Sequence, residues 1–520
     1  MMRRAGLAGL SEDAAIAGLT ADSRAVGPGM VFAALPGARA DGRAFIAEAV
    51  ERGAAAVIAP AGTEWPPGVP VRPLIASADP RRTLALMAAA FHGAQPRCVV
   101  AVTGTNGKTS TVDFLRQIWI SAGERAASLG TLGLVAEGFP PGPTLTTPDP
   151  VALHATLAAL ARAGFGAAAM EASSHGIDQR RLDGVVLAAA GFSNLTRDHL
   201  DYHGSMEAYR AAKLRLFDTL LPVGAAAAAC TEMDAATLEA LRAIAAKRRL
   251  RLLTVGEAGE AMRLVAARPL PDGQALEVET FGARHAFHLP LPGRFQADNA
   301  LLAAALAVGA GLPADQVLAA LPRLAGVRGR MERAAVLANG AAVYVDYAHT
   351  PDALARLLSA LRPHTAGRLH VLFGAGGDRD PGKRPLMGAA AAAGADRVWV
   401  TDDNPRSEDA AAIRAAVLAG APGAIDAGAR EAAIAAALSD LGPGDVLAVA
   451  GKGHESGQEI AGIVHPFDDV AGGWARGGGQ TAQGRGPAGR PPAPPAGAPA
   501  PRMGATETPI SVRISMPALP

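Results

Sequence analysis

The stretch that decides the fold reads Val99-Val100-Ala101-Val102-Thr103-Gly104-Thr105-Asn106-Gly107-Lys108-Thr109-Ser110. Its β-branched first half predicts a strand, and its two glycines predict a tight turn. Apolar residues then recur at helical spacing until Gly123, which predicts a helix that begins at the lysine. A strand, a glycine-rich turn and a helix N-terminus together point backbone N–H groups at a polyphosphate. The stretch therefore predicts an ATP site.

Two side chains of this loop add chemistry of their own. Lys108 offers a mobile positive charge for the outer phosphates, and the Thr109 hydroxyl can bind Mg²⁺. The spacing Gly-x-x-Gly-Lys-Thr is shorter than that of most phosphate loops, which points to a narrower family. The alternative, a glycine-rich loop with a surface lysine, is the weaker interpretation.

The composition excludes several classes of protein. A chain of 520 residues with 49% apolar residues is expected to form two to four domains with real cores. The net charge of +1 provides no global field for nucleic acid or anionic lipid. No run of about 18 apolar residues predicts a membrane span, and the N-terminus lacks the apolar core of a signal peptide. Two cysteines distant in sequence, Cys98 and Cys230, fit a reducing cytoplasm.

Strands and helices alternate in three successive blocks, which predicts an α/β fold with mostly parallel sheets. The expected units are residues 1–94, 95–329, 330–476 and a tail of 477–520. The expected strands are 30–35, 98–102, 167–171, 186–192, 343–347, 369–373, 397–401 and 445–450, and a helix is expected at 45–52. The tail has ten prolines and eight glycines among its 44 residues and no apolar periodicity, so we expect it to be disordered.

Charged residues follow two of the expected strands in the second block. Glu171 ends one strand within Glu-Ala-Ser-Ser-His-Gly, where a carboxylate beside a phosphate loop can bind Mg²⁺ or simply cap the next helix. The segment 194–204, Asn-Leu-Thr-Arg-Asp-His-Leu-Asp-Tyr-His-Gly, crowds ionisable groups after an apolar run. Lys213 follows, and taken alone it is typical of a solvated helix lysine.

Each expected strand of the third block ends in a polar or glycine-rich cluster, which is where open α/β sheets place their ligands. Arg379 and Arg406 can each bind a carboxylate through two hydrogen bonds, and Glu455 can accept from an ammonium group. Such opposed charges fit a zwitterionic amino acid better than a second nucleotide. Ordinary turn chemistry is the alternative, but four successive clusters argue against it.

Seven motifs in this order resemble one known family. They read Gly-Thr-Asn-Gly-Lys-Thr, Glu-Ala-Ser-Ser-His-Gly, Asn-Leu-Thr-Arg-Asp-His-Leu-Asp-Tyr-His-Gly, Asp-Tyr-Ala-His-Thr-Pro-Asp, Gly-Gly-Asp-Arg-Asp, Asp-Asn-Pro-Arg and Gly-Lys-Gly-His-Glu. The series resembles the Mur ligases, and in particular those members that add 2,6-diaminopimelate, from about Asp22 to about residue 470.

The resemblance implies three domains, namely a small N-terminal α/β domain for UDP, a central P-loop-type ATPase domain and a C-terminal Rossmann-like domain for the amino acid. It implies that ATP phosphorylates the D-glutamate γ-carboxylate of UDP-N-acetylmuramoyl-L-alanyl-D-glutamate, and that an amine of meso-diaminopimelate attacks the acyl phosphate. It also implies Mg²⁺, small-molecule partners only, a monomer, and a place in peptidoglycan precursor synthesis.

The resemblance assigns the catalytic and ATP roles residue by residue. Lys108, Glu171, His199 and Lys213 form the implied catalytic set. Lys213 matches the carbamylated lysine of the family, and a carbamate would turn this cation into an anionic Mg²⁺ ligand beside Thr109 and Glu171. The positions implied for ATP are Gly104, Thr105, Asn106, Gly107, Lys108, Thr109, Ser110, Asn299, Arg330 and Asp346.

Two further sets of positions are implied for the other substrates. Those for the UDP-sugar dipeptide are Ala21, Ser23, Ala38, Arg39, Ala40, Thr146, Thr147, Ser173, Gln179 and Arg181. The match is looser in this set, since Leu145 stands where a polar residue is common. Those for diaminopimelate are Arg379, Asp403, Asn404, Pro405, Arg406, Gly451 and Glu455.

The acceptor amino acid depends on Arg406. Diaminopimelate carries a second carboxylate that lysine lacks, and leaving a buried arginine unpaired would reject lysine by a factor on the order of 10⁴ by analogy with other polar sites. L-Lysine stays open as an alternative acceptor, and a non-catalytic nucleotide-binding scaffold is the alternative from another class. Folylpolyglutamate synthase shares the implied second and third domains, but the N-terminal block and the Asp-Asn-Pro-Arg run argue against it.

Overall fold

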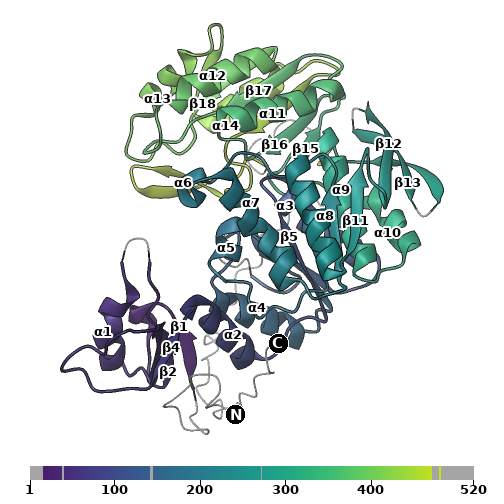
Figure 1. The fold of residues 1–520 in the computed structure, drawn as a ribbon. Helices are drawn as coiled ribbons and strands as arrows, with labels where there is room; N and C mark the ends of the chain where they lie inside the picture. The colour runs from purple at the N-terminus through teal and green to yellow at the C-terminus, as the bar shows by residue number, and fades with distance from the viewer. Residues whose placement is uncertain are drawn as a thin grey trace, which may run out of the picture.

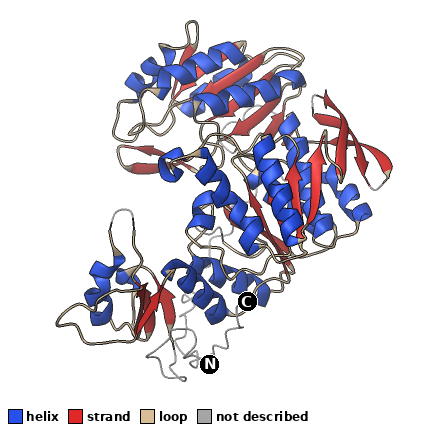
Figure 2. Ribbon diagram, in the orientation of Figure 1, coloured by secondary structure: helices blue, strands red, loops and turns tan. Residues whose placement is uncertain are grey.

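The computed structural model describes residues 16–37, 40–140, 145–270, 272–280, 282–470 and 480–481. Within them the chain forms three helix-covered sheets that follow one another in sequence, and one separate hairpin (Figure 1). Helices lie on both faces of the two larger sheets, as Figure 2 makes plain, so the central strands of these sheets are buried on both sides. The described part has no helix that combines the length and the apolar character needed to cross a membrane.

The N-terminal sheet is fully parallel and has four strands in chain order. They are β1 (Gly18–Thr20), β2 (Met30–Ala33), β3 (Ala56–Pro60) and β4 (Leu74–Ser77). Helix α1 (Ile46–Glu51) packs on one face and α2 (Pro80–His92) on the other. The strand expected at 30–35 and the helix expected at 45–52 are confirmed, but the helix is entered through a 3-10 turn at Gly42–Phe45.

The central sheet has ten strands in the order β14-β13-β12-β11-β10-β9-β5-β8-β6-β7. Their bounds are β5 (Cys98–Thr103), β6 (Ala126–Gly130), β7 (Gly133–Val135), β8 (Ala167–Glu171), β9 (Ala189–Phe192), β10 (Ala226–Cys230), β11 (Arg251–Gly256), β12 (Met262–Leu270), β13 (Gly273–Thr280) and β14 (Ala283–Leu289). The strand expected at 186–192 begins only at Ala189, because the Val186 N–H bonds to the Gln95 side chain instead of to a neighbouring strand. The antiparallel extension β12–β14 was not among our expectations.

Helices cover the two faces of this sheet in separate groups. On one face lie α3 (Lys108–Ser121), α9 (Arg294–Gly309) and α10 (Ala314–Ala320). On the other lie α4 (Pro150–Arg162), α5 (Ser174–Asp178), α7 (Met206–Arg215) and α8 (Ala235–Arg248), with the short α6 (Leu200–His203) before α7. Strand β5 lies between β8 and β9, so the loops after these three parallel strands share one edge of the sheet.

The C-terminal sheet has the order β19-β18-β17-β20-β16-β15-β23. Its strands are β15 (Glu332–Val336), β16 (Ala342–Asp346), β17 (Leu369–Phe373), β18 (Arg397–Thr401), β19 (Ile425–Gly428), β20 (Val446–Ala450) and β23 (Gln480–Thr481). Helices α11 (Pro351–Leu361), α12 (Lys383–Gly394) and α13 (Ala410–Leu418) cover one face, and α14 (Arg430–Ser439) covers the other. The hairpin is β21 (Gly457–Ile460) with β22 (Ile463–Pro466).

The tail differs from our expectation at two residues. Gln480 and Thr481, within the segment 477–520 that we expected to be disordered, pair antiparallel with β15. An edge strand has unpaired backbone N–H and C=O groups, and another segment can form hydrogen bonds with them whatever side chains it carries. The rest of the tail lies outside the described residues.

His364 joins the central and C-terminal sheets. Its Nε2 accepts from the Gly293 N–H at 2.9 Å, and its Nδ1 donates to the Leu270 carbonyl at 2.8 Å. Both partners belong to the central unit, whereas His364 follows α11 of the C-terminal unit. The neutral imidazole therefore fixes the packing of the two units at this point.

A fully buried ion pair stabilises the C-terminal unit next to a strand end. Arg430 of α14 pairs with Asp469 at 2.7 Å with both side chains 0% exposed, and it also donates to the Ala450 carbonyl at the end of β20. Removing one partner of such a pair leaves an uncompensated charge in the interior.

We therefore predict that Asp469→Ala lowers the free energy of unfolding by about 3–5 kcal/mol, measured by urea denaturation followed by circular dichroism. The control is Asp352→Ala, which removes an exposed pair with Arg356 on α11 and is expected to cost less than about 1 kcal/mol. Equal losses for the two variants would contradict this account.

Candidate active site

The predicted phosphate loop connects β5 to the first turn of α3. Gly104 and Gly107 have φ values of +146° and +83°, which side chains disfavour. Residues after the neighbouring strand β9 hold the loop in place: the Ser193 hydroxyl donates to the Asn106 carbonyl at 2.6 Å, and the Asn106 N–H donates to the Asn194 side chain at 3.0 Å. The loop is thus preformed at the positive end of a 14-residue helix.

Two lysines converge on one carbonyl of this loop. The Nζ of Lys108 donates to the Gly104 carbonyl at 2.9 Å, and the Nζ of Lys213, from α7, donates to the same oxygen at 2.8 Å. Lys213 is 1% exposed, which rules out the solvated surface lysine that its sequence context allowed. Burial, with the nearby Lys108 charge, holds the pKa of Lys213 well below its usual value. The neutral amine is therefore accessible at a far lower pH than for a free lysine.

Glu171 lies beside the loop at the end of β8 and is 1% exposed. The Thr109 hydroxyl donates to its Oε1 at 3.0 Å, and the Thr131 N–H donates to the same oxygen at 2.8 Å. Gly130 leaves room for this carboxylate, since a Cβ there would lie 2.0 Å from Oε1. Thr109 and Glu171, both predicted metal ligands, are thus brought together with their oxygen atoms adjacent.

A cluster of rings borders the loop near Lys213. His199 has a φ of +52°, and its ring lies 4.9 Å from that of His175 and 6.2 Å from that of Tyr209. The Tyr209 hydroxyl lies 3.2 Å from the Thr105 hydroxyl, and the Nζ of Lys213 lies 4.6 Å from the centre of the Tyr209 ring. The unusual backbone of His199 therefore places its ring beside Tyr209, which contacts both the loop and Lys213.

Of the remaining predicted ATP residues, Asn299 and Arg330 approach the loop from different units, whereas Asp346 lies near Arg330. Asn299 of α9 touches it, since a Cβ on Gly107 would come within 2.3 Å of its Oδ1. Arg330 belongs to the C-terminal unit, yet its charge lowers the pKa of Lys108, after the larger effect of burial. Asp346, at the end of β16, accepts from two backbone N–H groups at 2.8 Å, and burial raises its pKa.

A cleft of about 650 Å³ lies between the N-terminal sheet and the helices α4 and α5. It brings together Ala21, Gln179 and Arg181 of the predicted UDP-sugar set, and also Arg81, which sequence reasoning missed. Ser23 does not line it, because its hydroxyl donates to Glu48 at 2.8 Å. Ala40 is exposed, whereas Ala38 and Arg39 lie outside the described residues.

A row of hydroxyls leads from this cleft to Glu171. Arg181 donates to the Thr147 carbonyl at 2.6 Å, and the Thr147 hydroxyl lies 3.0 Å from that of Ser173 and donates to the Glu171 carbonyl. The Thr146 hydroxyl lies 3.2 Å from that of Thr131, which in turn contacts Glu171. Hydrogen bonds therefore connect part of the predicted UDP-sugar set to the predicted metal-ligand pair.

In the C-terminal unit, the predicted amino-acid residues meet at the ends of β18 and β20. The Asn404 amide donates to Glu455 at 3.0 Å, and the fully buried Lys452 donates to both of them, at 3.0 and 3.2 Å. A Cβ on Gly451 would lie 2.6 Å from the Asp403 carboxylate, so this glycine allows the two strand ends to approach.

The predicted arginines of this set differ in their surroundings. Arg406 adopts a φ of +53°, donates to the Gly377 carbonyl at 2.7 Å, and lies 3.2 Å from a Glu459 carboxylate oxygen. Arg379 is exposed at the rim of the same cluster. Two guanidinium groups in one cluster suit the binding of carboxylate groups.

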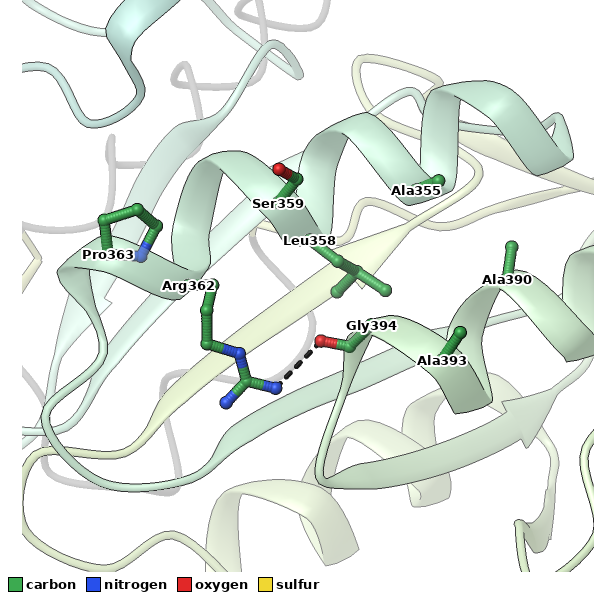
Figure 3. Close-up of a pocket in the computed structure, with 8 residues that line it drawn as sticks. All are labelled: Ala355, Leu358, Ser359, Arg362, Pro363, Ala390, Ala393 and Gly394. Atoms are coloured by element: carbon green, nitrogen blue, oxygen red, sulfur yellow. Dashed lines mark hydrogen bonds between the residues drawn. The ribbon is translucent and has the colours of Figure 1, made fainter.

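A second hollow, between α11 and α12, is unrelated to these clusters. Figure 3 shows its lining of alanines with Leu358, Ser359, Arg362 and Pro363, and the Arg362 guanidinium bonded to the Gly394 carbonyl at 2.8 Å. Arg362 is also paired with Asp396 at 2.6 Å. Its charge is thus already satisfied, and none of the predicted site residues lines this groove.

Sequence reasoning missed several residues of the site. Thr131, Arg81 and Glu459 belong to no recognisable motif, and only the fold brings them to Glu171, Arg181 and Arg406. Lys452 stands inside a motif that we noted, but its burial beneath Asn404 has no sequence signal.

The fold and the loop define a nucleoside-triphosphate-binding α/β protein whose C-terminal sheet presents a charged cluster to the same region. Family models match in the same order: "Mur ligase family, catalytic domain" over residues 15–92, "Mur ligase middle domain" over 102–307 and "Mur ligase, glutamate ligase domain" over 329–453. The chain belongs to the Mur ligase family.

Two curated relatives share the name UDP-N-acetylmuramoyl-L-alanyl-D-glutamate–2,6-diaminopimelate ligase. The protein of Caulobacter vibrioides is 56% identical over 467 residues, which cover 88% of this chain and 95% of that protein. The protein of Mesorhizobium japonicum is 53% identical over 461 residues, which cover 88% and 94%.

Solved structures agree with this fold. A structure of a UDP-N-acetylmuramoyl-L-alanyl-D-glutamate–2,6-diaminopimelate ligase, 35% identical, superposes with a TM-score of 0.68 and covers 88% of this chain and 93% of that one. Mycobacterium tuberculosis folylpolyglutamate synthase, 22% identical, covers only 71% of this chain with a TM-score of 0.57, which is a likeness of fold.

We predict that Gly107→Ala weakens binding of a fluorescent ATP analogue by about tenfold or more, because it combines a strained backbone with an overlap onto Asn299. Gly62→Ala is the matched control, since Gly62 has a similar φ of +80° but open space around it. A dissociation constant that Gly107→Ala leaves within twofold of the original would contradict this account of the loop.

Proposed function

We propose that this protein is an ATP-dependent ligase that joins meso-2,6-diaminopimelate to the D-glutamate γ-carboxylate of UDP-N-acetylmuramoyl-L-alanyl-D-glutamate. The observation that carries the proposal is Arg406, held in the Asp-Asn-Pro-Arg loop after β18 of a chain whose β5 leads into a phosphate loop. The names of relatives at more than 50% identity support it.

The UDP-sugar substrate fits the cleft between the first two units. Arg81 and Arg181 both line it, and within the described part of the chain neither guanidinium has a carboxylate partner. Burial lowers the pKa of Arg181 and the Arg81 charge acts in the same direction, against the opposite effect of Asp149, which also lines the cleft. The diphosphate of UDP would relieve this repulsion, and the hydroxyls of Thr147 and Ser173 then lead the peptide toward Glu171.

The first chemical step activates the carboxylate, which is otherwise a poor electrophile. One γ-carboxylate oxygen attacks the γ-phosphorus of ATP, the bond from that phosphorus to the ADP oxygen breaks, and an acyl phosphate forms. This step needs positioning and charge neutralisation, which the loop N–H groups and Lys108 supply. His199 lies against the same region and completes the proposed catalytic set.

Mg²⁺ fits the oxygen pair of Thr109 and Glu171, because it prefers hard oxygen ligands, and when bound it would neutralise charge on the phosphates. No group of three or more histidine, cysteine or acidic side chains in the described residues could hold a metal. Mg²⁺ commonly takes its remaining ligands from water and substrate phosphates, and a carbamate on Lys213 would add a second anionic protein ligand.

Carbamate formation requires the neutral amine of Lys213, whose nitrogen bonds to the carbon of CO₂ and releases one proton. The lowered pKa of Lys213 makes that amine available at a lower pH than in a free lysine, and rising pH favours the carbamate. We predict that wild type equilibrated with ¹³C-bicarbonate gives a carbamate signal in ¹³C NMR, and that Lys213→Ala loses the signal and about 100-fold or more of kcat.

Lys247→Arg, at a lysine whose side chain is 76% exposed, is the control and is expected to retain both the signal and the rate. Full activity of the wild type without a carbamate signal would overturn the role of Lys213.

The second step joins the amino acid. The amine nitrogen attacks the carbonyl carbon of the acyl phosphate, and the tetrahedral intermediate collapses with loss of phosphate and of the amine proton. Glu455, held by Asn404 and Lys452, can accept from an ammonium group of the amino acid. Arg406, with Arg379 at the rim, can bind the carboxylate that lysine lacks.

The decisive test is ATP-dependent phosphate release in the presence of UDP-N-acetylmuramoyl-L-alanyl-D-glutamate, with meso-diaminopimelate or L-lysine as acceptor. We expect activity with diaminopimelate, little with lysine, and a loss of at least about 100-fold in kcat/KM for diaminopimelate in Arg406→Ala. Equal use of lysine would overturn the role of Arg406, whereas no release with either acceptor would favour a non-catalytic scaffold.

We also propose that the protein works as a monomer in the cytoplasm, in the synthesis of peptidoglycan precursors, with ATP, the UDP-sugar dipeptide and the amino acid as its partners. We assign the N-terminal, central and C-terminal units, 1–94, 95–329 and 330–476, to the UDP-sugar, ATP and amino acid respectively. Size-exclusion chromatography with light scattering measures the mass in solution, and we expect the mass of one chain, 52.5 kDa.

A further inference from the structure

Several hydrogen bonds join the hairpin β21–β22 to the loop that holds Arg406. The Arg406 N–H donates to the Glu459 carbonyl at 3.1 Å, and the Ala461 N–H donates to the Arg406 carbonyl at 2.8 Å. The Glu459 N–H donates to the Asn404 side chain at 3.0 Å, and the Gln458 amide donates to the Asp403 carbonyl at 2.5 Å. One strand of the hairpin therefore contacts three of the four residues in the Asp-Asn-Pro-Arg loop.

The side chain of Glu459 adds a contact to the guanidinium itself. Its Oε2 lies 3.2 Å from the Nε of Arg406, while the Nη1 of Arg406 donates to the Gly377 carbonyl at 2.7 Å. Among the described residues, Nη2 donates no hydrogen bond. The guanidinium is thus held on two sides and leaves one edge for a ligand.

We propose that Glu459 is a positioning residue that orients the Arg406 guanidinium for the second carboxylate of the acceptor amino acid. The inference rests on the proposed function, in which Arg406 binds that carboxylate. Glu459 acts only through Arg406, touches no reacting atom, and sets the affinity for a dicarboxylic acceptor.

Orientation, not charge attraction, explains how Glu459 contributes. The side chains of Arg406 and Glu459 are 22% and 41% exposed, so solvent screens the pair and its own attraction is weak. A free arginine side chain, however, loses much rotamer freedom when it binds a ligand. A guanidinium that is already fixed by Glu459 and Gly377 has lost most of that freedom before the acceptor arrives.

The experiment measures KM and kcat for meso-diaminopimelate in Glu459→Gln and Glu459→Asp. We expect Glu459→Gln to raise this KM about 3- to 10-fold with kcat within twofold, and to leave the KM values for ATP and the UDP-sugar dipeptide unchanged. Glu459→Asp keeps the charge, but its shorter side chain cannot hold the guanidinium in the same place, so we expect it to raise this KM at least as much as Glu459→Gln does.

A double-mutant cycle separates this role from a structural one. In an Arg406→Ala background, Glu459→Gln is expected to have no further effect on kcat/KM for diaminopimelate. Glu431→Gln makes the same change of charge at an exposed position of α14, and we expect wild-type kinetics. Thermal midpoints within about 2 °C of wild type would establish that Glu459→Gln folds normally.

Three results would overturn the inference. An unchanged KM for diaminopimelate would mean that Glu459 does not orient Arg406, and a lower KM would mean that it competes with the substrate carboxylate. If Glu459→Gln lowered kcat/KM for diaminopimelate as much in the Arg406→Ala background as in wild type, Glu459 would act through the hairpin and not through Arg406. If wild type itself does not use diaminopimelate, the proposed function fails, which is a different outcome from any of these three.

Discussion

One carbonyl oxygen, that of Gly104, accepts from two lysine side chains that come from different helices. Burial opposes a charge on either amine, and the charge of Lys108 also opposes one on Lys213. The carboxylates of Glu171, near Lys108, and of Asp198 offset these effects only in part, so the pKa of each lysine is lowered. The arrangement therefore favours a neutral amine or added negative charge. A triphosphate near Lys108 and a carbamate on Lys213 would each supply negative charge. Thr109, Glu171 and Tyr209 lie around the same loop.

Parallel sheets explain why the other groups gather around this loop. Strand β5 lies between β8 and β9, so Glu171 and Asn194 emerge on either side of the phosphate loop. In the C-terminal sheet, β18, β17, β20 and β16 are successive neighbours, so their four terminal clusters form one surface. Arg330 lies 5.0 Å from the centre of the Tyr347 ring, in the cluster after β16, and its charge also lowers the pKa of Lys108, so this part of the second surface lies near the loop.

Local sequence patterns were sufficient to predict the phosphate loop, the strands that precede each cluster, and the kinds of residue at the strand ends. They were insufficient where the partner is distant in sequence: Lys213 lies 109 residues after Gly104, and its helix has the composition of an exposed one. The pairing of Gln480–Thr481 with β15 also had no local signal, because a sheet edge binds backbone and not particular side chains. Glu459 belongs to the same class, since only the hairpin brings it to Arg406.

The central claim is that the chain activates a carboxylate by phosphorylation before it forms the amide. The most direct test uses UDP-N-acetylmuramoyl-L-alanyl-D-glutamate labelled with ¹⁸O in its γ-carboxylate and analyses the released phosphate by mass spectrometry. The oxygen that attacks phosphorus leaves with it, so the account predicts one ¹⁸O atom in each phosphate released. Phosphate free of ¹⁸O, released together with the amide product, would contradict the account.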